Sequence, residues 1–241
     1  MKRWNRHHFE YRESIVTFLC GDKYLAAGEQ ALIGQRRILE SYIEKNPDFR
    51  TTHSPVNPEK APDLISRMCI QSRKVDVGPM ASVAGTLAFE ALSAMLEAGA
   101  PEAVVDNGGD MALFIHNPVR VGIFGGNTSL NTLALEVEPR DRPFGICTSS
   151  GVVGHSFSYG KTNAAIVFSS NIGLADAAAT ALGNRVKRIG DLENCFDFLN
   201  NLPEIEGGLV IYKDRLALWG QVPKLIRAEI SADLITMGKN P

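Results

Sequence analysis

The second half of this 241-residue chain is divided into short apolar runs that are separated by turn-forming residues. Runs of this length, bounded by Gly, Asn and Pro, are typical of strands that follow one another in an antiparallel sheet. The expected strands are 103–105, 111–115, 119–124, 132–137 and 164–168, with a further hairpin over 207–219. A doubly wound parallel sheet would need strict alternation of strands and helices, so the pattern favours an α+β fold.

Apolar residues at helical spacing predict helices in the first half of the chain and between the later strands. The expected helices are 29–45, 62–73, 79–98, 172–182 and 191–200. Pro79 suits the first turn of the third helix, and Gly99 suits its end. Ahead of these helices, 9–20 and 24–27 are expected to form a hairpin around Gly21. We therefore predict one domain over residues 1–241, an antiparallel sheet flanked by helices.

Composition limits the classes of partner. With 25 Lys and Arg against 27 Asp and Glu, the net charge of −2 provides no general attraction to nucleic acid or to an anionic membrane surface, so we expect a small-molecule ligand. The N-terminal residues lack the apolar region of a secretory signal, and no run approaches the roughly 18 apolar residues of a membrane span. These features predict a cytoplasmic protein, and a homo-oligomer is compatible with them. The four cysteines form no C-x-x-C pair and are expected to be buried, reduced thiols.

The segment 174–182 is an apolar, alanine-rich helix with one carboxylate and one hydroxyl. Asp176 and Thr180 are four residues apart, so both project from the same face of the helix. A buried carboxylate needs a cation, a donor or a ligand, and an all-oxygen set completed by a backbone carbonyl suits Mg²⁺. The alternative is structural, with Asp176 near the positive end of a helix and Thr180 bonding to the carbonyl four residues earlier.

Two small polar segments could approach a ligand. Residues 106–110 read Asp-Asn-Gly-Gly-Asp between two apolar runs, which predicts a tight hairpin turn. The same glycines would leave bare backbone for a flat or phosphorylated ligand, with Asp110 as an acceptor at the edge. Residues 148–151, Thr-Ser-Ser-Gly, are expected to form a turn whose hydroxyls and amides suit phosphate oxygens, although such turns are also common without a ligand.

His155 is the one histidine of five that is placed to act as a base, and its alternative is a surface or core role. A phosphate-loop interpretation of Gly160, Lys161 and Thr162 fails. Five residues separate Gly154 from Gly160 where that motif has four, and a strand is expected to follow where the motif needs a helix.

In this order, the segments resemble the ApbE-like family, whose best understood members are FAD:protein FMN transferases. The resemblance spans about 75–185 and rests on Val-Gly-Pro-Met-Ala at 77–81, Asn-Gly-Gly-Asp at 107–110, Thr-Ser-Ser-Gly at 148–151, His155, and 175–182. The last segment is the most specific, because its Asp and Thr stand where the family has its magnesium ligands. The resemblance implies a T-fold-like architecture.

Carried over residue by residue, the resemblance implies FMN transfer from FAD to an acceptor. Asp176 and Thr180 would bind Mg²⁺ together with the backbone carbonyl of Ala81, and His155 would stand where the family has the histidine that activates the acceptor hydroxyl. The flavin nucleotide cleft would be formed by Gly78, Ser82, Asn107, Gly108, Gly109, Asp110, Thr148, Ser149, Ser150 and Gly151.

The chain also departs from the transferase pattern. Transferases have Asp-Pro and Thr-Gly after that histidine, whereas here 156–160 lead directly to Lys161, and Ser82 and Leu87 replace a lysine and an aspartate on the early helix. Transferases are usually exported. A compact branch that keeps the fold and the metal pair but alters the substrate pocket fits these differences. The alternatives are a flavin- or nucleotide-binding protein without transferase activity, and an inert structural subunit whose cleft is filled by side chains.

Overall fold

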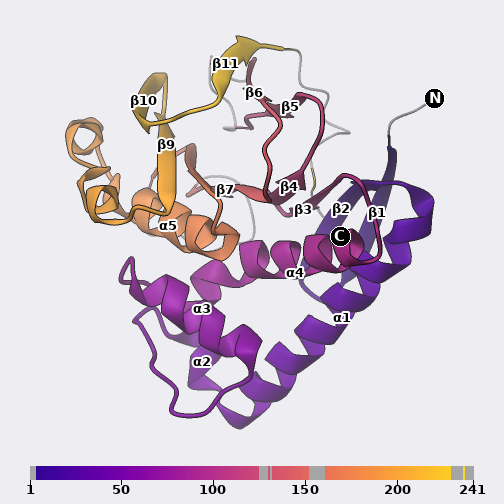
Figure 1. Cartoon of the computed structure of the whole chain (residues 1–241). Helices are drawn as coiled ribbons and strands as arrows, with labels where there is room; N and C mark the ends of the chain where they lie inside the picture. The colour runs from indigo at the N-terminus through magenta and orange to yellow at the C-terminus, as the bar shows by residue number, and fades with distance from the viewer. Residues whose placement is uncertain (1–3, 125–129, 131, 152–160, 229–235, 237–241) are drawn as a thin grey trace.

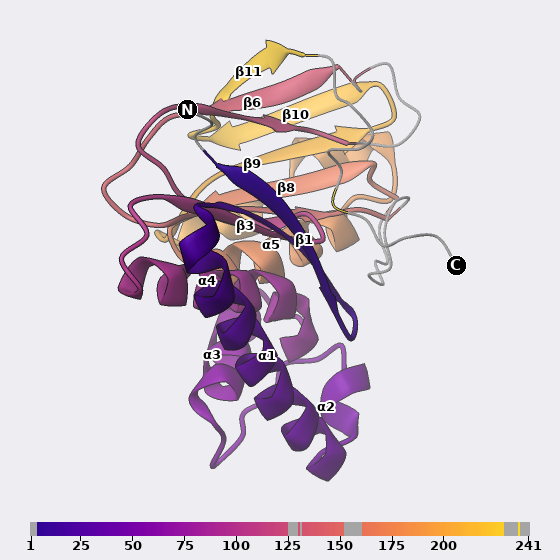
Figure 2. The same ribbon diagram turned by 90° about the vertical axis from the view of Figure 1, so that its right-hand side faces the viewer.

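The computed structural model describes residues 4–124, 130, 132–151, 161–228 and 236, and arranges them in three layers (Figure 1). Helices cover one face of a large sheet, and a smaller sheet lies over the other face (Figure 2). The strand pairings are antiparallel in both sheets. The prediction of an α+β protein with an antiparallel sheet and flanking helices is therefore confirmed, with the helices gathered on one side.

The described residues form these elements. Along the large sheet the strands are β1 (Asn5–Tyr11), β2 (Ser14–Cys20), β3 (Ala103–Asn107), β4 (Asp110–Phe114), β7 (Phe144–Ser149), β8 (Ala164–Ser169), β9 (Ile205–Tyr212) and β10 (Arg215–Gly220). The small sheet has the order β11 (Lys224–Arg227), β6 (Leu133–Val137) and β5 (Val119–Gly122). The α-helices are α1 (Asp22–Lys45), α2 (Asp48–Thr51), α3 (Asp63–Arg73), α4 (Val83–Glu97) and α5 (Ile172–Arg185). The 3₁₀ helices are η1 (Pro79–Ser82), η2 (Ile189–Glu193) and η3 (Asp197–Asn201).

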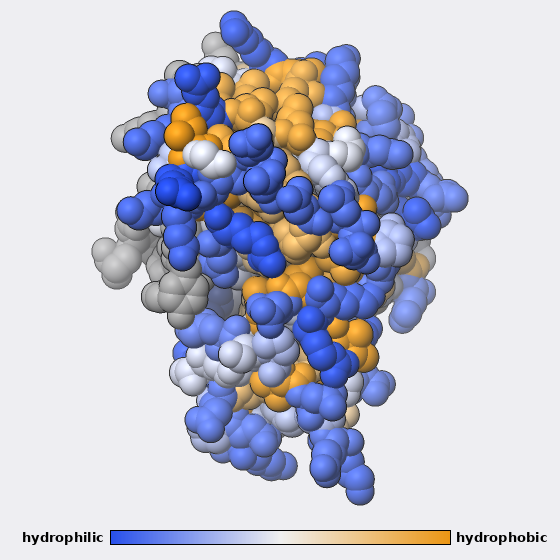
Figure 3. All heavy atoms as spheres, turned by 90° about the vertical axis from the view of Figure 1, so that its left-hand side faces the viewer, coloured by the Kyte–Doolittle hydropathy of each residue, from blue (hydrophilic) through white to orange (hydrophobic). Residues whose placement is uncertain are grey.

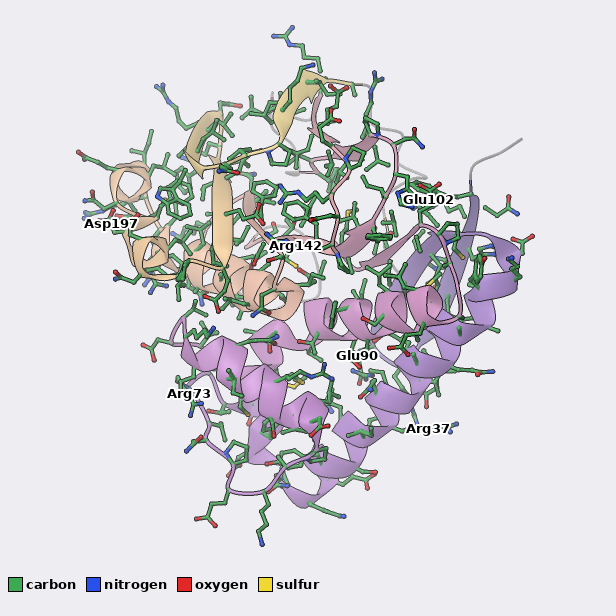
Figure 4. All side chains as sticks on the ribbon, in the orientation of Figure 1. Arg37, Arg73, Glu90, Glu102, Arg142 and Asp197 are labelled. Carbon is green, nitrogen blue, oxygen red and sulfur yellow. The ribbon has the colours of Figure 1, made fainter. Side chains whose placement is uncertain are left out.

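Two apolar cores lie on opposite faces of the large sheet. Successive side chains of a strand point to opposite faces, so Ala103 and Val105 of β3 pack in the helical core while Val104 packs between the two sheets. Within the helical layer, Glu90 of α4 accepts hydrogen bonds from Arg67 of α3 at 2.7 Å and from Gln35 of α1 at 3.1 Å (Figure 4). These bonds tie three helices together around one carboxylate.

The helix that begins at Pro79 supports the sheet beside the site. Residues 79–97 are, in the described part of the chain, the one helical stretch that is long and apolar enough to cross a membrane, which corrects the expectation that no run approaches this length. Half of this stretch is buried within the protein, where α4 packs against α1, α5, β3 and β4. A core helix of a globular protein meets the same length and composition criteria. Gly99 follows the end of α4 with a φ of +90°, as expected for the glycine that stops a helix.

Two local predictions were wrong. The first hairpin is formed by β1 and β2 and turns at Arg12, whose φ is +55°, and α1 already begins at Asp22. The helix expected over 191–200 is replaced by η2 and η3, between which Cys195 and Phe196 turn into the core. The segment after Pro223 carried no prediction, but it contains β11. The four cysteines are buried and free, as expected.

One side of the molecule shows apolar side chains at its surface (Figure 3). Leu216 and Leu218 of the edge strand β10 are 38% and 50% exposed, and Ile189 of η2 is 57% exposed. The two leucines are two residues apart, so they point to the same face of β10. This surface is separate from the cavity described below, whose lining includes none of the three residues.

Candidate functional site

The hairpin between β3 and β4 forms a bare turn at the edge of a large cavity. Asn107 pairs with Asp110 across a two-residue loop in which Gly108 and Gly109 have φ values of +66° and +102°. Positive φ at both positions is the geometry of a type I′ turn, which explains the two glycines. A Cβ on Gly108 would meet no atom within 4 Å, so packing does not require glycine there. The predicted tight turn is confirmed, and its backbone faces the cavity.

The end of β7 lies beside this turn. Thr148 and Ser149 are the last two residues of β7 and pair with Ile166 and Ala165 of β8, so the turn expected at 148–151 is displaced by two residues. The pairing with β8 imposes extended geometry here, whereas β4 pairs only with residues 144–146 of β7. The backbone N–H of Thr148 donates to Oδ1 of Asp110 at 3.2 Å, which fixes this carboxylate against β7.

Helix α5 supplies the second carboxylate. Its N-cap residue Asn171 accepts a hydrogen bond from the backbone N–H of Leu174 at 3.3 Å, and nearly the whole helix is buried. Asp176 is only 7% exposed, whereas Thr180 is half-buried, and both line the cavity. The prediction that these two side chains share a face is consistent with their common place in the cavity wall.

Asp176 is held by the first turn of another helix. Its Oδ2 accepts a hydrogen bond from the backbone N–H of Gly85 in α4 at 2.8 Å, and the N–H of Ala84 also bonds to this carboxylate. Unpaired N–H groups and the positive end of the helix dipole favour a negative charge at this position. A Cβ on Gly85 would lie 2.8 Å from Cβ of Asp176, so only glycine permits this approach.

Burial raises the proton affinity of both carboxylates, and the charge of Asp176 adds to the effect at Asp110. Burial raises the pKa of Asp176 to about 7, although the amides of Gly85 and Ala84 favour its charged form. Burial, followed by the nearby charge of Asp176, raises the pKa of Asp110 well above its ordinary value. Burial and both carboxylates also raise the pKa of the Cys147 thiol, which bonds to Asp110. In the described part of the chain, no ion pair involves Asp110 or Asp176.

The cavity has a volume of about 1820 Å³ and brings most of the predicted site residues together. Those that line it are Gly78, Ala81, Asn107, Gly108, Gly109, Asp110, Thr148, Ser150, Asp176 and Thr180. An open space of this size contradicts the inert alternative, which required a cleft filled by side chains.

Three predicted residues are placed differently, and the placement of a fourth is not described. Ser82 is fully buried and its hydroxyl lies 2.9 Å from the carbonyl of Pro79 and 3.2 Å from that of Met68, so it faces the core. Ser149 and Gly151 are absent from the cavity lining among the described residues. His155 lies outside the described residues. The strand expected after Thr162, where a phosphate loop needs a helix, is present as β8.

Sequence reasoning missed several residues of the cavity wall. Asp106 and Thr236 line the cavity and are buried, and Asn184 lies on the exposed end of α5 beside it. Asp106 belonged to the predicted turn segment, where an aspartate before Asn-Gly-Gly was a usable signal. Thr236 had none, because nothing near it in sequence suggests a buried hydroxyl.

A family model described as "AbpE bacteria" matches residues 2–192 of the chain. The UPF0280 protein of Methanocella arvoryzae is 44% identical over 95% of this chain and 94% of its own length. The UPF0280 protein of Archaeoglobus fulgidus is 41% identical over 97% of this chain and 99% of its own length.

Solved structures show a similar fold at low sequence identity. The flavinyl transferase ApbE of Pseudomonas stutzeri, in its apo form, is 12% identical with a TM-score of 0.59, covering 98% of both chains. The ApbE protein of Thermotoga maritima is 11% identical with a TM-score of 0.52, covering 97% of this chain and 100% of its own. The match to the family model and the similarity to the two UPF0280 proteins show that this protein belongs to the ApbE-like family, among its UPF0280 relatives.

Proposed function

We propose that this protein is a magnesium-dependent enzyme that acts on a flavin dinucleotide, transferring FMN from FAD to an acceptor. The observation that carries the proposal is the pair of buried carboxylates, Asp110 and Asp176, at the wall of a large cavity. Two such groups are unfavourable without a cation, and the described ion pairs supply none. A divalent cation would offset both their burial and their mutual repulsion.

The residues present fit Mg²⁺. This ion prefers oxygen ligands, keeps several waters and often bridges to phosphate. Asp176, Thr180 and the carbonyl of Ala81 line the same cavity and would hold it. Among the described residues, no three His, Cys, Asp or Glu side chains cluster as they would at a carboxylate-rich metal site, and the proposed set contains only one carboxylate. When bound, Mg²⁺ supplies Lewis-acid stabilisation of negative charge on phosphate oxygens.

The remaining wall suits a nucleotide. Gly108 and Gly109 leave backbone exposed for a flat or phosphorylated group, and Thr148 and Ser150 add hydroxyls beside them. The name of the Pseudomonas stutzeri neighbour, flavinyl transferase, supports a flavin as this nucleotide. Orienting the pyrophosphate against the acceptor would be the principal task of these groups.

The proposed transfer breaks one P–O bond and forms another. The acceptor hydroxyl oxygen attacks the phosphorus of the FMN half, AMP leaves with the electrons of the broken bond, and the hydroxyl proton passes to a base. His155 is the proposed base. The product is a phosphodiester between FMN and the acceptor.

A binding protein without turnover is the second candidate. It is favoured by the placement of Ser82, which replaces a lysine in the resemblance and is turned into the core rather than toward the cavity. Binding and transfer share the same cavity, so only turnover separates the two functions.

Calorimetric titration of metal-stripped protein with FAD, with and without Mg²⁺, tests the proposal. We expect saturable binding that requires Mg²⁺ and is weakened at least tenfold in Asp176→Asn, because asparagine keeps the acceptor oxygen but removes the charge. Asp141→Asn, at an exposed loop position, is the matched control. Release of AMP on adding hydroxyl-bearing acceptors would distinguish the enzyme from the binder. Absence of FAD binding by the wild type in both conditions would refute the flavin assignment.

A further inference from the structure

The turn between β3 and β4 is connected to the C-terminal part of the chain through one carboxylate. Asp106 lies on β3, and its Oδ1 accepts a hydrogen bond from the backbone N–H of Gly109 at 2.9 Å. Its Oδ2 accepts a hydrogen bond from the hydroxyl of Thr236, 130 residues further along the chain. One side chain therefore joins the ligand-facing turn to a residue remote in sequence.

Thr236 is itself fixed by a neighbouring strand. It is 9% exposed, and its Oγ1 lies 2.9 Å from Oγ1 of Thr17 on β2. Thr17 pairs with Asp106 in the sheet, so the three side chains lie side by side. A threonine hydroxyl carries one proton. Thr236 donates it to Asp106 and accepts from Thr17, so hydrogen bonds from the side of β2 and from the turn meet at the carboxylate of Asp106.

The residues that flank the turn are held by the pairing of Asn107 with Asp110 and by the bond from the Asn107 side chain to the carbonyl of Ala84, but packing adds little at the two glycines. A Cβ on Gly108 would meet no atom within 4 Å, and one on Gly109 would meet only Cβ of Thr148 at 4.0 Å. Packing therefore leaves the two glycines free, and the bond from Gly109 to Asp106 orients their peptide groups. A buried carboxylate holds such a bond well only while its other oxygen is also satisfied. Burial raises the pKa of Asp106, and the bonds from Thr236 and Gly109 oppose that rise.

We propose that Thr236 is a positioning residue, which acts through Asp106 to hold the Gly108–Gly109 turn in the conformation that receives the ligand. Asp106, Thr236 and both glycines line the same cavity as Asp110 and Asp176. The identity of the ligand rests on the proposed function, whereas the connection between Thr236 and the turn rests only on the hydrogen bonds above.

The test compares Thr236→Val, which keeps the shape but removes the hydroxyl, with Thr236→Ser, which keeps the hydroxyl. Amide hydrogen exchange at Gly109 reports on the turn, and titration with FAD in Mg²⁺ reports on the site. Loss of a hydrogen bond to a charged group changes an equilibrium constant by about tenfold or more. In Thr236→Val we expect exchange at Gly109 to be about tenfold faster and the Kd for FAD to rise about tenfold. Thr236→Ser should match the wild type.

The amides of β8 provide the internal reference. Faster exchange at Gly109 with unchanged exchange in β8 would show local release of the turn rather than general unfolding. Thr17→Val, which leaves the bond between Thr236 and Asp106 in place, should produce a smaller change in the same direction, and it also provides the comparison if Thr236→Val does not fold.

Unchanged Gly109 exchange in folded Thr236→Val, or in Thr17→Val when that is the only folded variant, would overturn the inference. Faster exchange without a change in the Kd for FAD would overturn the positioning role. If wild-type protein does not bind FAD, the proposed function fails. The exchange result at Gly109 then decides the connection between Thr236 and the turn independently.

Discussion

The buried charge of Asp176 predicts an unusual effect of Asp176→Asn on the metal-free protein. The substitution should raise the free energy of unfolding at pH 8 instead of lowering it. Asparagine is close in shape to aspartate, and its side-chain oxygen can accept the same hydrogen bonds from Gly85 and Ala84. The substitution removes the negative charge of Asp176, a residue that is only 7% exposed and lies near Asp110.

The sign follows from proton binding. The pKa of Asp176 is about 7 in the folded protein and 3.8 as an ordinary aspartate. Between these values the folded state binds more protons than the unfolded state, so the free energy of unfolding falls as the pH rises through this window. Above pH 7 the full penalty of about 4 kcal/mol is present, since each pKa unit corresponds to about 1.4 kcal/mol. At pH 4 the protonated aspartate and the asparagine should be nearly equivalent.

Urea denaturation of metal-stripped protein at pH 4.5 and pH 8 measures the difference. The stability advantage of Asp176→Asn should widen by about 3 kcal/mol between the two conditions. Asp141→Asn, on the exposed loop, should show no such widening. An equal difference at both pH values, or a variant that is less stable than the wild type at pH 8, would refute the reasoning that the Asp176 carboxylate is buried without compensation.

Further predictions concern the metal and the helix contact. Calorimetry should show that the affinity for Mg²⁺ falls about tenfold per pH unit below pH 7, because the ion must displace the proton of Asp176. An affinity that does not change with pH would contradict this prediction. Thr180→Val should weaken Mg²⁺ binding in the same assay with little change in urea midpoint, since Thr180 is half-buried at the cavity. Gly85→Ala should lower the free energy of unfolding by about 1–3 kcal/mol, because its Cβ would lie 2.9 Å from the carbonyl oxygen of Ile172. Gly34 is the matched helical position, because a Cβ there would meet nothing within 4 Å. Gly34→Ala should raise the free energy of unfolding by about 0.5–1 kcal/mol in the same denaturation experiment.

Local chemistry made the elements around the site predictable. Pro79 and Gly99 bracket a long apolar helix, and the glycines at 108 and 109 determine a two-residue turn. The face shared by Asp176 and Thr180 follows from helical periodicity alone. In each case a few adjacent residues carry the whole signal, so no tertiary information was needed.

Other features depend on partners that are distant in sequence. The edge strand β1 is largely exposed and has apolar side chains only at Phe9 and Tyr11, so its pairing with β2 could not be read from its own residues. The extension of β7 through Thr148 and Ser149 is imposed by β8, although Thr-Ser-Ser-Gly is typical of a turn. Thr236 contacts Asp106 and Thr17 only because the chain returns to the sheet after β11.

The placement of Asp176 couples the proposed ligand site to the stability of the fold. Its carboxylate accepts hydrogen bonds from the first turn of α4 and also faces the cavity, so one group belongs to both the helix packing and the site. Any ligand that binds the folded state alone stabilises it in proportion to the logarithm of its concentration over its Kd. A cation that neutralises Asp176 has the additional effect of removing the pH-dependent penalty. Stability at pH 8 is therefore a direct measure of occupancy, and it can rank cations and nucleotides before any acceptor is identified.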